Sequence, residues 1–285
     1  MPASEVAVPS RPSREDSLAR VTDDVIATFR RDGGVWIPGL LAPEWLRLIE
    51  QGIERNLKHP GPLAKMHEPG DPGEFFDDYC NFQVIPEYQI LLAESPIVDV
   101  MARLLQSEKL WLYCDQIFVK EGYSQRTRWH QDEPYWVAEG ENMATMWIAT
   151  QVLSEEETLE FVRGSRKLPS FDHRMNGGIM TSLTSKATPI PDVENERGKW
   201  DIVSHASQPG DVLVFHPGVL HGGGSMRDGG TRASLGLRFF GDGTRYIERE
   251  MQPDPAFPGI SATLRPGDPL VHSWFPQVYP RATWG

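Results

Sequence analysis

Cysteine is scarce in this chain, and the sequon for N-glycosylation is absent. Only Cys80 and Cys114 occur among the 285 residues, which is too few for a framework of disulfide bonds. No Asn-x-Ser/Thr sequence is present. We therefore expect a reducing compartment, with the cytoplasm as the default localisation.

Long apolar runs and an excess of positive charge are also missing. No stretch approaches the roughly 18 apolar residues that a membrane span requires, and the N-terminus lacks the apolar core of a signal peptide. The formal net charge of −12 argues against nucleic acid as a partner, because phosphate binding needs a basic surface. It also argues against a basic membrane-binding face. A small molecule is the expected partner, and the sequence predicts no oligomeric state.

The composition that remains is that of an ordinary globular protein, with 39% hydrophobic and 24% charged residues. Residues 1–20 are rich in Ser, Pro, Arg and Glu and predict a flexible tail, whereas residues 21–285 predict a single domain. A helical flank is expected over about 21–108. Its helices begin at Thr22 and Pro43 and include two further pieces at 87–93 and 96–105, while the Pro- and Gly-rich segment 59–73 predicts a loop.

From residue 110 the pattern changes to short runs rich in β-branched and aromatic residues. These runs are 110–120, 143–153, 159–162, 211–215 and 231–240. Short strands that follow a group of helices predict a mainly β core of about 109–241, an antiparallel sandwich or barrel with flanking α-helices. We expect a loop insertion at 166–207 and a C-terminal extension at 242–285. Substrate specificity is expected to depend on that insertion and on the loop 59–73.

One short stretch carries a metal-binding pattern. In Trp129–Trp136, His130 and Asp132 lie two residues apart, so a strand would point both side chains to the same face. A histidine and a carboxylate of this kind, joined by a distant histidine, form the facial triad of non-haem iron sites. An isolated His-x-Asp is weak evidence, and a surface contact is the simple alternative.

The third ligand must be chosen among the remaining histidines. His216 and His221 both follow the strand expected at 211–215. We choose His221, because the glycines that follow it allow a close approach of the backbone to a metal and its other ligands. His216 stands before a Pro-Gly turn and is the weaker candidate.

The strand expected at 231–240 has one unusual face. Strand parity places Arg232, Ser234, Gly236 and Arg238 together, opposite a plain packing face. A buried arginine requires an anion, and its planar guanidinium matches a carboxylate, with the Ser234 hydroxyl in support. Three metal ligands and this clamp predict a dicarboxylate co-substrate. Arg238 is expected to form a structural ion pair and is left outside the site.

The chain resembles the phytanoyl-CoA dioxygenase family of iron(II)- and 2-oxoglutarate-dependent oxygenases. The resemblance extends from about Val21 to the end and is specific over Trp129–Trp136, Leu159–Arg166, Gly210–Gly222 and Arg232–Phe240. It implies a double-stranded β-helix core, a jelly roll of the cupin type. It further implies that His130, Asp132 and His221 hold iron, and that Arg232 with Ser234 binds the distal carboxylate of 2-oxoglutarate.

Four aromatic or amide residues complete the set of candidates. By the same resemblance, Trp147 lines the co-substrate pocket and Gln116 contacts the co-substrate. Tyr135 and Trp136 are candidate substrate contacts, with packing as the alternative. Arg163 stands where relatives often carry proline, and we draw no functional conclusion from that departure.

The activity that the resemblance implies uses Fe(II), 2-oxoglutarate and O2. It is most simply the hydroxylation of a small or mid-sized organic molecule, such as a natural-product intermediate, a lipid-like acid or an amino-acid derivative, with release of succinate and CO2. An intact Asp132 favours hydroxylation, since related halogenases have a small residue in its place. Desaturation, ring formation and epimerisation share the same residues and stay open.

Two other classes compete with the oxygenase. One is a metal-dependent jelly-roll enzyme that does not use 2-oxoglutarate, and the other is a non-catalytic metal- or ligand-binding barrel. The clamp of Arg232 and Ser234 argues against the first, and the complete ligand set argues against the second. No cluster of Lys and Arg indicates a coenzyme A site, so the family name does not identify the substrate.

Overall fold

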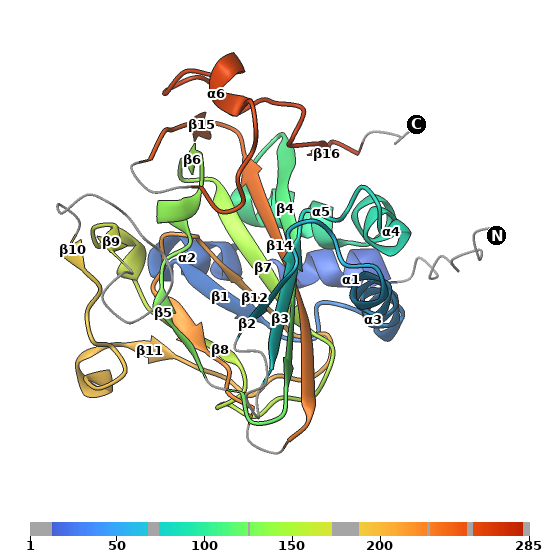
Figure 1. Cartoon of the computed structure of the whole chain (residues 1–285), viewed down its shortest axis with the longest axis vertical. Helices are drawn as coiled ribbons and strands as arrows, with labels where there is room; N and C mark the ends of the chain where they lie inside the picture. The colour runs from blue at the N-terminus through green and yellow to red at the C-terminus, as the bar shows by residue number, and fades with distance from the viewer. Residues whose placement is uncertain are drawn as a thin grey trace.

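Two antiparallel β-sheets form the centre of the molecule (Figure 1). The computed structural model describes residues 13–67, 74–124, 126–172, 188–226, 229–249 and 253–281. The larger sheet has the strand order β1-β12-β7-β14-β4-β3-β2, with β16 also paired to β4, and the smaller sheet has the order β11-β8-β13-β5. The predicted mainly β, jelly-roll fold is confirmed.

The strand bounds follow the predicted runs closely. In the larger sheet they are β1 Gly34–Ile37, β2 Lys65–His67, β3 Phe75–Tyr79, β4 Leu110–Glu121, β7 Met143–Ala149, β12 Val212–Phe215, β14 Thr231–Gly241 and β16 Gln277–Tyr279. In the smaller sheet they are β5 Thr127–His130, β8 Leu159–Val162, β11 Ile202–Val203 and β13 His221–Gly223. Two short pairs lie outside the sheets, β6 Ala138–Glu139 with β15 Arg245–Tyr246, and β9 Phe171–Asp172 with β10 Thr188–Pro189.

Strand β14 lies in the middle of the larger sheet and separates two environments. It pairs with β4 on one side and with β7 on the other. Leu235, Leu237 and Phe239 pack into the main hydrophobic core, as the predicted parity requires. The opposite face of the strand carries Arg232 and Arg238 and is turned toward a cavity.

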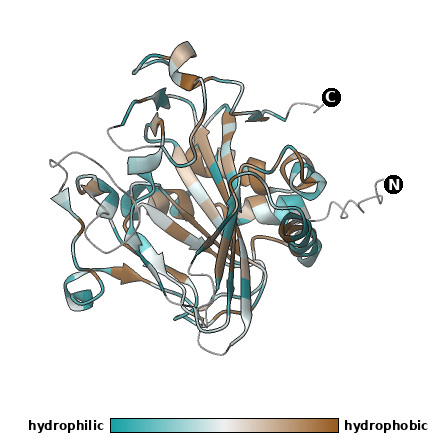
Figure 2. Ribbon diagram, viewed as in Figure 1, coloured by the Kyte–Doolittle hydropathy of each residue, from teal (hydrophilic) through white to brown (hydrophobic). Residues whose placement is uncertain are grey.

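Helices cover the outer face of the larger sheet. Their bounds are α1 Ser13–Arg20, α2 Asp23–Asp32, α3 Pro43–Lys58, α4 Pro86–Glu94 and α5 Ile97–Leu105. The short α6 Ile260–Thr263 lies apart from them and packs in a separate apolar cluster. In Figure 1 the helices α1, α3, α4 and α5 group on one side of β4 and β14. Their apolar residues share one core with the sheet, and in Figure 2 the strands of the sheet are largely brown while α3 shows a teal outer side.

The predicted helix boundaries have local causes that the structure bears out. Thr22 caps α2, since its hydroxyl accepts a hydrogen bond from the Val25 amide, and Gly33 ends the helix at a positive φ of 82°. Pro43 opens α3 at its first turn. These signals are local, so the sequence alone predicts them.

Three segments depart from expectation. Residues 13–20, expected in a flexible tail, form α1, because the Ser17 hydroxyl donates to the Leu40 carbonyl and Arg14 pairs with Asp99. Within the predicted loop 59–73, residues 65–67 form β2 against β3, and 68–73 lie outside the described residues, as do 1–12. The described parts of the insertion 166–207 contain β9, β10 and β11, and 173–187 are again outside.

No helix among the described residues is both long and apolar enough to span a bilayer.

Candidate metal centre

Two histidines face each other across neighbouring strands of the smaller sheet. His130 ends β5 and His221 begins β13, and the register pairs them directly. Their ring centroids are 4.1 Å apart. Gly222 permits this closeness, because a Cβ there would lie 2.9 Å from the Thr127 carbonyl oxygen. The glycine after His221 therefore serves the approach of the two strands.

Asp132 reaches the same point by a turn rather than by strand alternation. The strand ends at His130, and Asp132 has helical backbone angles (φ −77°, ψ −34°) before the 3-10 turn Glu133–Tyr135. Its amide, like that of Glu133, donates to the Pro217 carbonyl. The strand alternation considered for His130 and Asp132 therefore stops at His130, although the two side chains do converge.

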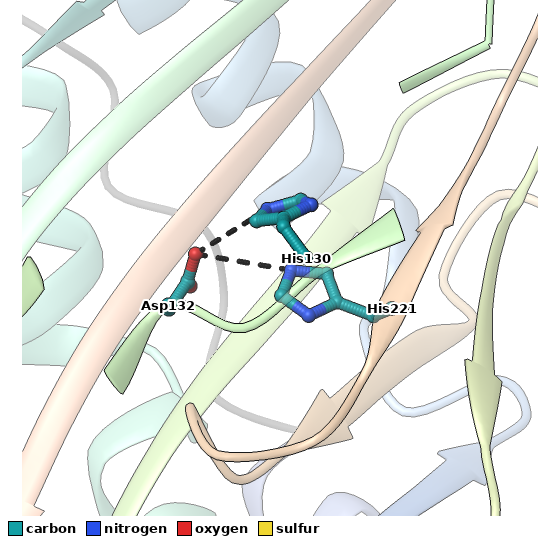
Figure 3. Close-up of side chains that lie close together, drawn as sticks. All are labelled: His130, Asp132 and His221. Atoms are coloured by element: carbon teal, nitrogen blue, oxygen red, sulfur yellow. Dashed lines mark ion pairs between the residues drawn. The ribbon is translucent and has the colours of Figure 1, made fainter. Parts of the chain in front are cut away.

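The three side chains point toward one another (Figure 3). Asp132 Oδ1 lies 3.5 Å from His130 Nε2 and 3.8 Å from His221 Nε2. One ligand atom from each residue lies within 4.8 Å of the others. Two imidazoles and one carboxylate converging in this way match the donor set of a facial non-haem iron site.

Backbone carbonyls fix the orientation of both imidazoles. The Nδ1 of His130 is 2.8 Å from the Arg128 carbonyl oxygen, and the Nδ1 of His221 is 3.0 Å from that of Val219. An imidazole nitrogen at this distance from a carbonyl donates its hydrogen, so in the neutral imidazole Nε2 is the nitrogen that carries the lone pair. Both Nε2 atoms are therefore ready to bind a metal.

The electrostatics of the centre favour the ligand forms of these groups. Burial, and next the proximity of His130, lower the pKa of His221 to about 3, so this imidazole is neutral near pH 7. Burial alone would raise the pKa of Asp132, but the Arg238 guanidinium and the two histidines outweigh burial and hold it far below its ordinary value. Asp132 is thus a carboxylate.

The buried Asp132 carboxylate supports a cation at this place. Its Oδ1 faces both imidazoles, whereas Oδ2 is inaccessible to solvent, lies 3.6 Å from Arg238 Nε and has no hydrogen-bond partner in the part of the chain that the structure describes. A buried acceptor left in that state costs about 1–3 kcal/mol, or more for a charged group. A metal ion bound to the triad through Oδ1 would offset the negative charge of this carboxylate.

A cavity of about 410 Å³ opens beside the triad, within the range of small-molecule sites. Arg232 reaches into it, with one Nη1 donating to the Glu157 carbonyl. Its Nε, and the Ser234 hydroxyl on the same strand, have no partner among the described residues. Burial lowers the pKa of Arg232 to about 10, so the guanidinium is still charged near pH 7. A carboxylate would satisfy the Arg232 Nε, whereas Ser234 is fully buried and is not among the residues that line the cavity.

The two predicted co-substrate contacts lie in one row across three strands. Gly236 of β14 pairs with Gln116 of β4 on one side and with Trp147 of β7 on the other. Both side chains line the cavity. The Trp147 ring centre is 6.0 Å from the Arg232 guanidinium carbon, so the indole forms part of the clamp's surroundings.

The candidate substrate contacts and the rejected histidine are also placed. Tyr135 and Trp136 line the cavity, but Trp136 is 1% exposed and stacks on Tyr113 with centroids 4.4 Å apart, so packing is its main contact. His216 turns away from the triad: its Nδ1 accepts from the Gly218 amide, and its Nε2 lies 3.1 Å from the Gly140 carbonyl oxygen.

Sequence reasoning missed several residues of the cavity. Arg238 lines it and lies 3.6 Å, from Nε to Oδ2, from Asp132. Its strand parity with Arg232 was the sequence signal that could have placed Arg238 in the site. The sequence alone favoured a structural ion pair for it, and so it was left out. Further lining residues include Lys120, Thr145, Tyr79 and Asp254. Lys120 shares the strand parity of Gln116, whereas nothing in the sequence points to Asp254.

Comparisons with known proteins agree with this geometry. A model of the family described as Phytanoyl-CoA dioxygenase (PhyH) matches residues 29–234. A curated relative, the multifunctional dioxygenase prhA of Penicillium brasilianum, is 24% identical over 277 residues, which cover 88% of this chain and 80% of that protein.

Solved structures share the fold. The non-haem alpha-ketoglutarate-dependent carbocyclase SnoK from nogalamycin biosynthesis superposes with a TM-score of 0.69 at 21% identity, covering 91% of this chain and 97% of its own. The epimerase SnoN, in complex with Fe3+, alpha ketoglutarate and nogalamycin RO, gives 0.68 at 22% identity, covering 93% and 99%. The family match spans most of the sequence, and the chain belongs to the phytanoyl-CoA dioxygenase family of iron(II)- and 2-oxoglutarate-dependent oxygenases.

Proposed function

We propose that this protein hydroxylates a small or mid-sized organic molecule and converts 2-oxoglutarate and O2 to succinate and CO2. The observation that carries the proposal is the meeting, in one cavity, of a complete ligand triad and a buried cationic clamp. A metal-binding barrel without 2-oxoglutarate chemistry has no use for the second feature.

The chain's own groups divide the work. His130, Asp132 and His221 would hold iron through two imidazole nitrogens and a carboxylate oxygen. When bound, iron(II) with 2-oxoglutarate supplies the O2 activation that couples decarboxylation of the co-substrate to oxidation of a substrate C–H bond. Arg232 and Ser234 would bind the distal carboxylate.

The cavity walls orient the co-substrate and exclude water. Trp147, Leu159 and Phe215 line the cavity and pack in one apolar cluster between the two sheets. A low-dielectric wall of this kind strengthens the attraction between the Arg232 guanidinium and a carboxylate. Gln116, which also lines the cavity, would donate an amide N–H to a co-substrate oxygen.

The remaining part of the cavity is the proposed substrate side. Phe75, Tyr135 and Pro255 contribute apolar surface, while Tyr79 and Asp254 form a hydrogen-bonded polar edge. Tyr135 is half-buried and is the better of the two predicted aromatic contacts. Specificity is proposed to depend on the loop 59–73 and the insertion 166–207, and an exchange of either segment should change substrate preference.

The first test is an anaerobic titration with Fe(II) and then 2-oxoglutarate, followed by the visible metal-to-ligand charge-transfer absorption of the chelate. We expect the band in the wild type, its loss in His130→Ala, and its retention in the matched control Arg163→Ala. Arg163 forms ion pairs with Asp32 and Asp201 and is not among the residues that line the cavity. Succinate release and incorporation of one atom of 18O2 into product would then establish hydroxylation.

Other outcomes distinguish the competing functions. Iron binding without the band would favour a metal-dependent enzyme that does not use 2-oxoglutarate. No metal binding would favour a non-catalytic barrel. Product without 18O but with succinate release would favour ring closure or epimerisation, the reactions named for SnoK and SnoN.

A further inference from the structure

A second buried arginine faces the cavity from β14. Arg238 lies six residues beyond Arg232 on the same face of the strand, which is about 20 Å along an extended chain. It is 9% exposed and lines the cavity. Because the Asp132 carboxylate is next to Arg238, this arginine lies at the triad, far along the strand from the Arg232 clamp.

Among the residues that the structure describes, few acceptors use the hydrogen-bonding capacity of Arg238. Its Nε is 3.6 Å from Asp132 Oδ2, which is longer than the 2.7–3.2 Å typical of an N–H···O hydrogen bond. Its Nη1 has a weak contact of 4.0 Å with the Cys114 sulfur. A guanidinium carries five N–H donors in a planar fork, so donors of Arg238 remain for a ligand in the cavity.

A hydroxyl accompanies this arginine, as Ser234 accompanies Arg232. Thr145 of β7 is the direct register partner of Arg238. It is 3% exposed and lines the cavity, and its Oγ1 has no hydrogen-bond partner among the residues described. An unsatisfied buried hydroxyl beside a buried guanidinium is a two-point receptor for an oxygen anion.

The charge balance of the loaded site also favours an anionic ligand at Arg238; this step rests on the proposed function, which supplies iron(II) and 2-oxoglutarate. Iron(II), the 2-oxoglutarate dianion, Asp132 and Arg232 together cancel. Arg238 is then a buried cation whose nearest carboxylate is shared with the metal. A buried charge without its own counter-ion costs several kcal/mol, and an anionic substrate would supply that counter-ion.

We propose that Arg238 and Thr145 form a second carboxylate site, and that the substrate is an organic acid whose acidic group binds there next to the iron. Tyr135, a half-buried aromatic residue of the cavity wall, provides flat apolar surface for a ring system. The substrate class is therefore a ring-containing carboxylic acid.

The test uses anaerobic protein loaded with Fe(II) and 2-oxoglutarate, and two pairs of matched probes. These are benzoate with benzamide, and naphthalene-2-carboxylate with naphthalene-2-carboxamide. Binding is followed by the change in the charge-transfer absorption and by tryptophan fluorescence. We expect at least one acid to bind about tenfold or more tightly than its amide, a difference of about 1.4 kcal/mol.

Two variants assign that preference to the proposed residues. Arg238→Met should reduce the affinity for the acid to that for the amide. Thr145→Val preserves shape and removes only the hydroxyl, and should weaken acid binding about three- to tenfold with amide binding unchanged. The control Arg163→Met, which removes a half-exposed arginine from another part of the surface, should behave like the wild type.

The charge-transfer band itself reports the proposed function, so the two ideas fail separately. If the band forms and acid and amide bind equally, or neither acid binds, the carboxylate site is overturned. It is also overturned if both variants keep the acid preference, or if they weaken 2-oxoglutarate binding as strongly as a change at Arg232. Loss of the band in the wild type would instead refute the oxygenase assignment.

Discussion

Replacing Arg232 by methionine tests the co-substrate clamp most directly. The side chain is 2% exposed, and among the described residues it donates to the Glu157 carbonyl. Truncating one partner of a buried, hydrogen-bonded charge pair costs about 2–5 kcal/mol. The dissociation constant of 2-oxoglutarate should therefore rise by about 30-fold to several thousand-fold. Iron affinity should change little, because Arg232 contacts none of the three metal ligands in the structure.

The stability of the unliganded protein gives a second, opposite readout. Without co-substrate, Arg232 is a buried cation with an unsatisfied Nε, so methionine at this position should leave the free energy of unfolding unchanged or raise it. The wild type should gain about 2.7 kcal/mol of stability at 2-oxoglutarate concentrations 100-fold above its dissociation constant, and the variant should not. Thermal unfolding of the metal-loaded protein with and without 2-oxoglutarate measures both effects. An unchanged ligand-induced shift in Arg232→Met would refute the clamp, and an unfolded variant is recognised by the loss of iron binding.

Three further predictions concern the clamp, a helix terminus and a buried histidine. Gly224→Ala should lower 2-oxoglutarate affinity more than iron affinity in the same titration, because φ there is +73° and a Cβ would lie 2.0 Å from Arg232 Nη1. Thr22→Ala should reduce the free energy of unfolding by about 1 kcal/mol in urea denaturation, because it removes the cap on the Val25 amide. Burial, and next the positive charge of Arg166, lower the pKa of His216 to about 4 from 6.5. The unfolded chain therefore takes up this proton first as pH falls. Between pH 6.5 and 4 this histidine should cost up to about 1.4 kcal/mol of stability per pH unit, and the slope between pH 7 and 5 should be smaller in His216→Asn.

Much of the fold could be predicted because its causes are local. Caps, glycine stops and strand periodicity depend on neighbouring residues, so α2, α3 and the faces of β14 follow from the sequence. The helix α1 could not be predicted in this way, because it is stabilised by long-range contacts such as the hydrogen bond from the Ser17 hydroxyl to the Leu40 carbonyl. Composition alone gave no sign of that contact.

The candidate site could be predicted where one strand carries the information. Arg232 and Ser234 were found by parity within β14, and His221 by the glycines after it. The path to Asp132 was misjudged, since the Pro217 carbonyl, 85 residues away in sequence, holds the turn that presents it. Thr145 acquires its meaning only from its register with Arg238 on the neighbouring strand.

The central strand also sets a fixed length scale for the active site. Strand β14 pairs with β4 along its whole length and with β7 from Ser234 to Phe240, so the sheet fixes the backbone spacing of Arg232 and Arg238. The end proposed to bind the co-substrate is thereby separated from the end proposed to bind the substrate. New specificities can arise by exchange of surface loops while the backbone of this strand stays unchanged. Redesign toward a longer or shorter substrate should therefore alter those loops and leave the strand intact.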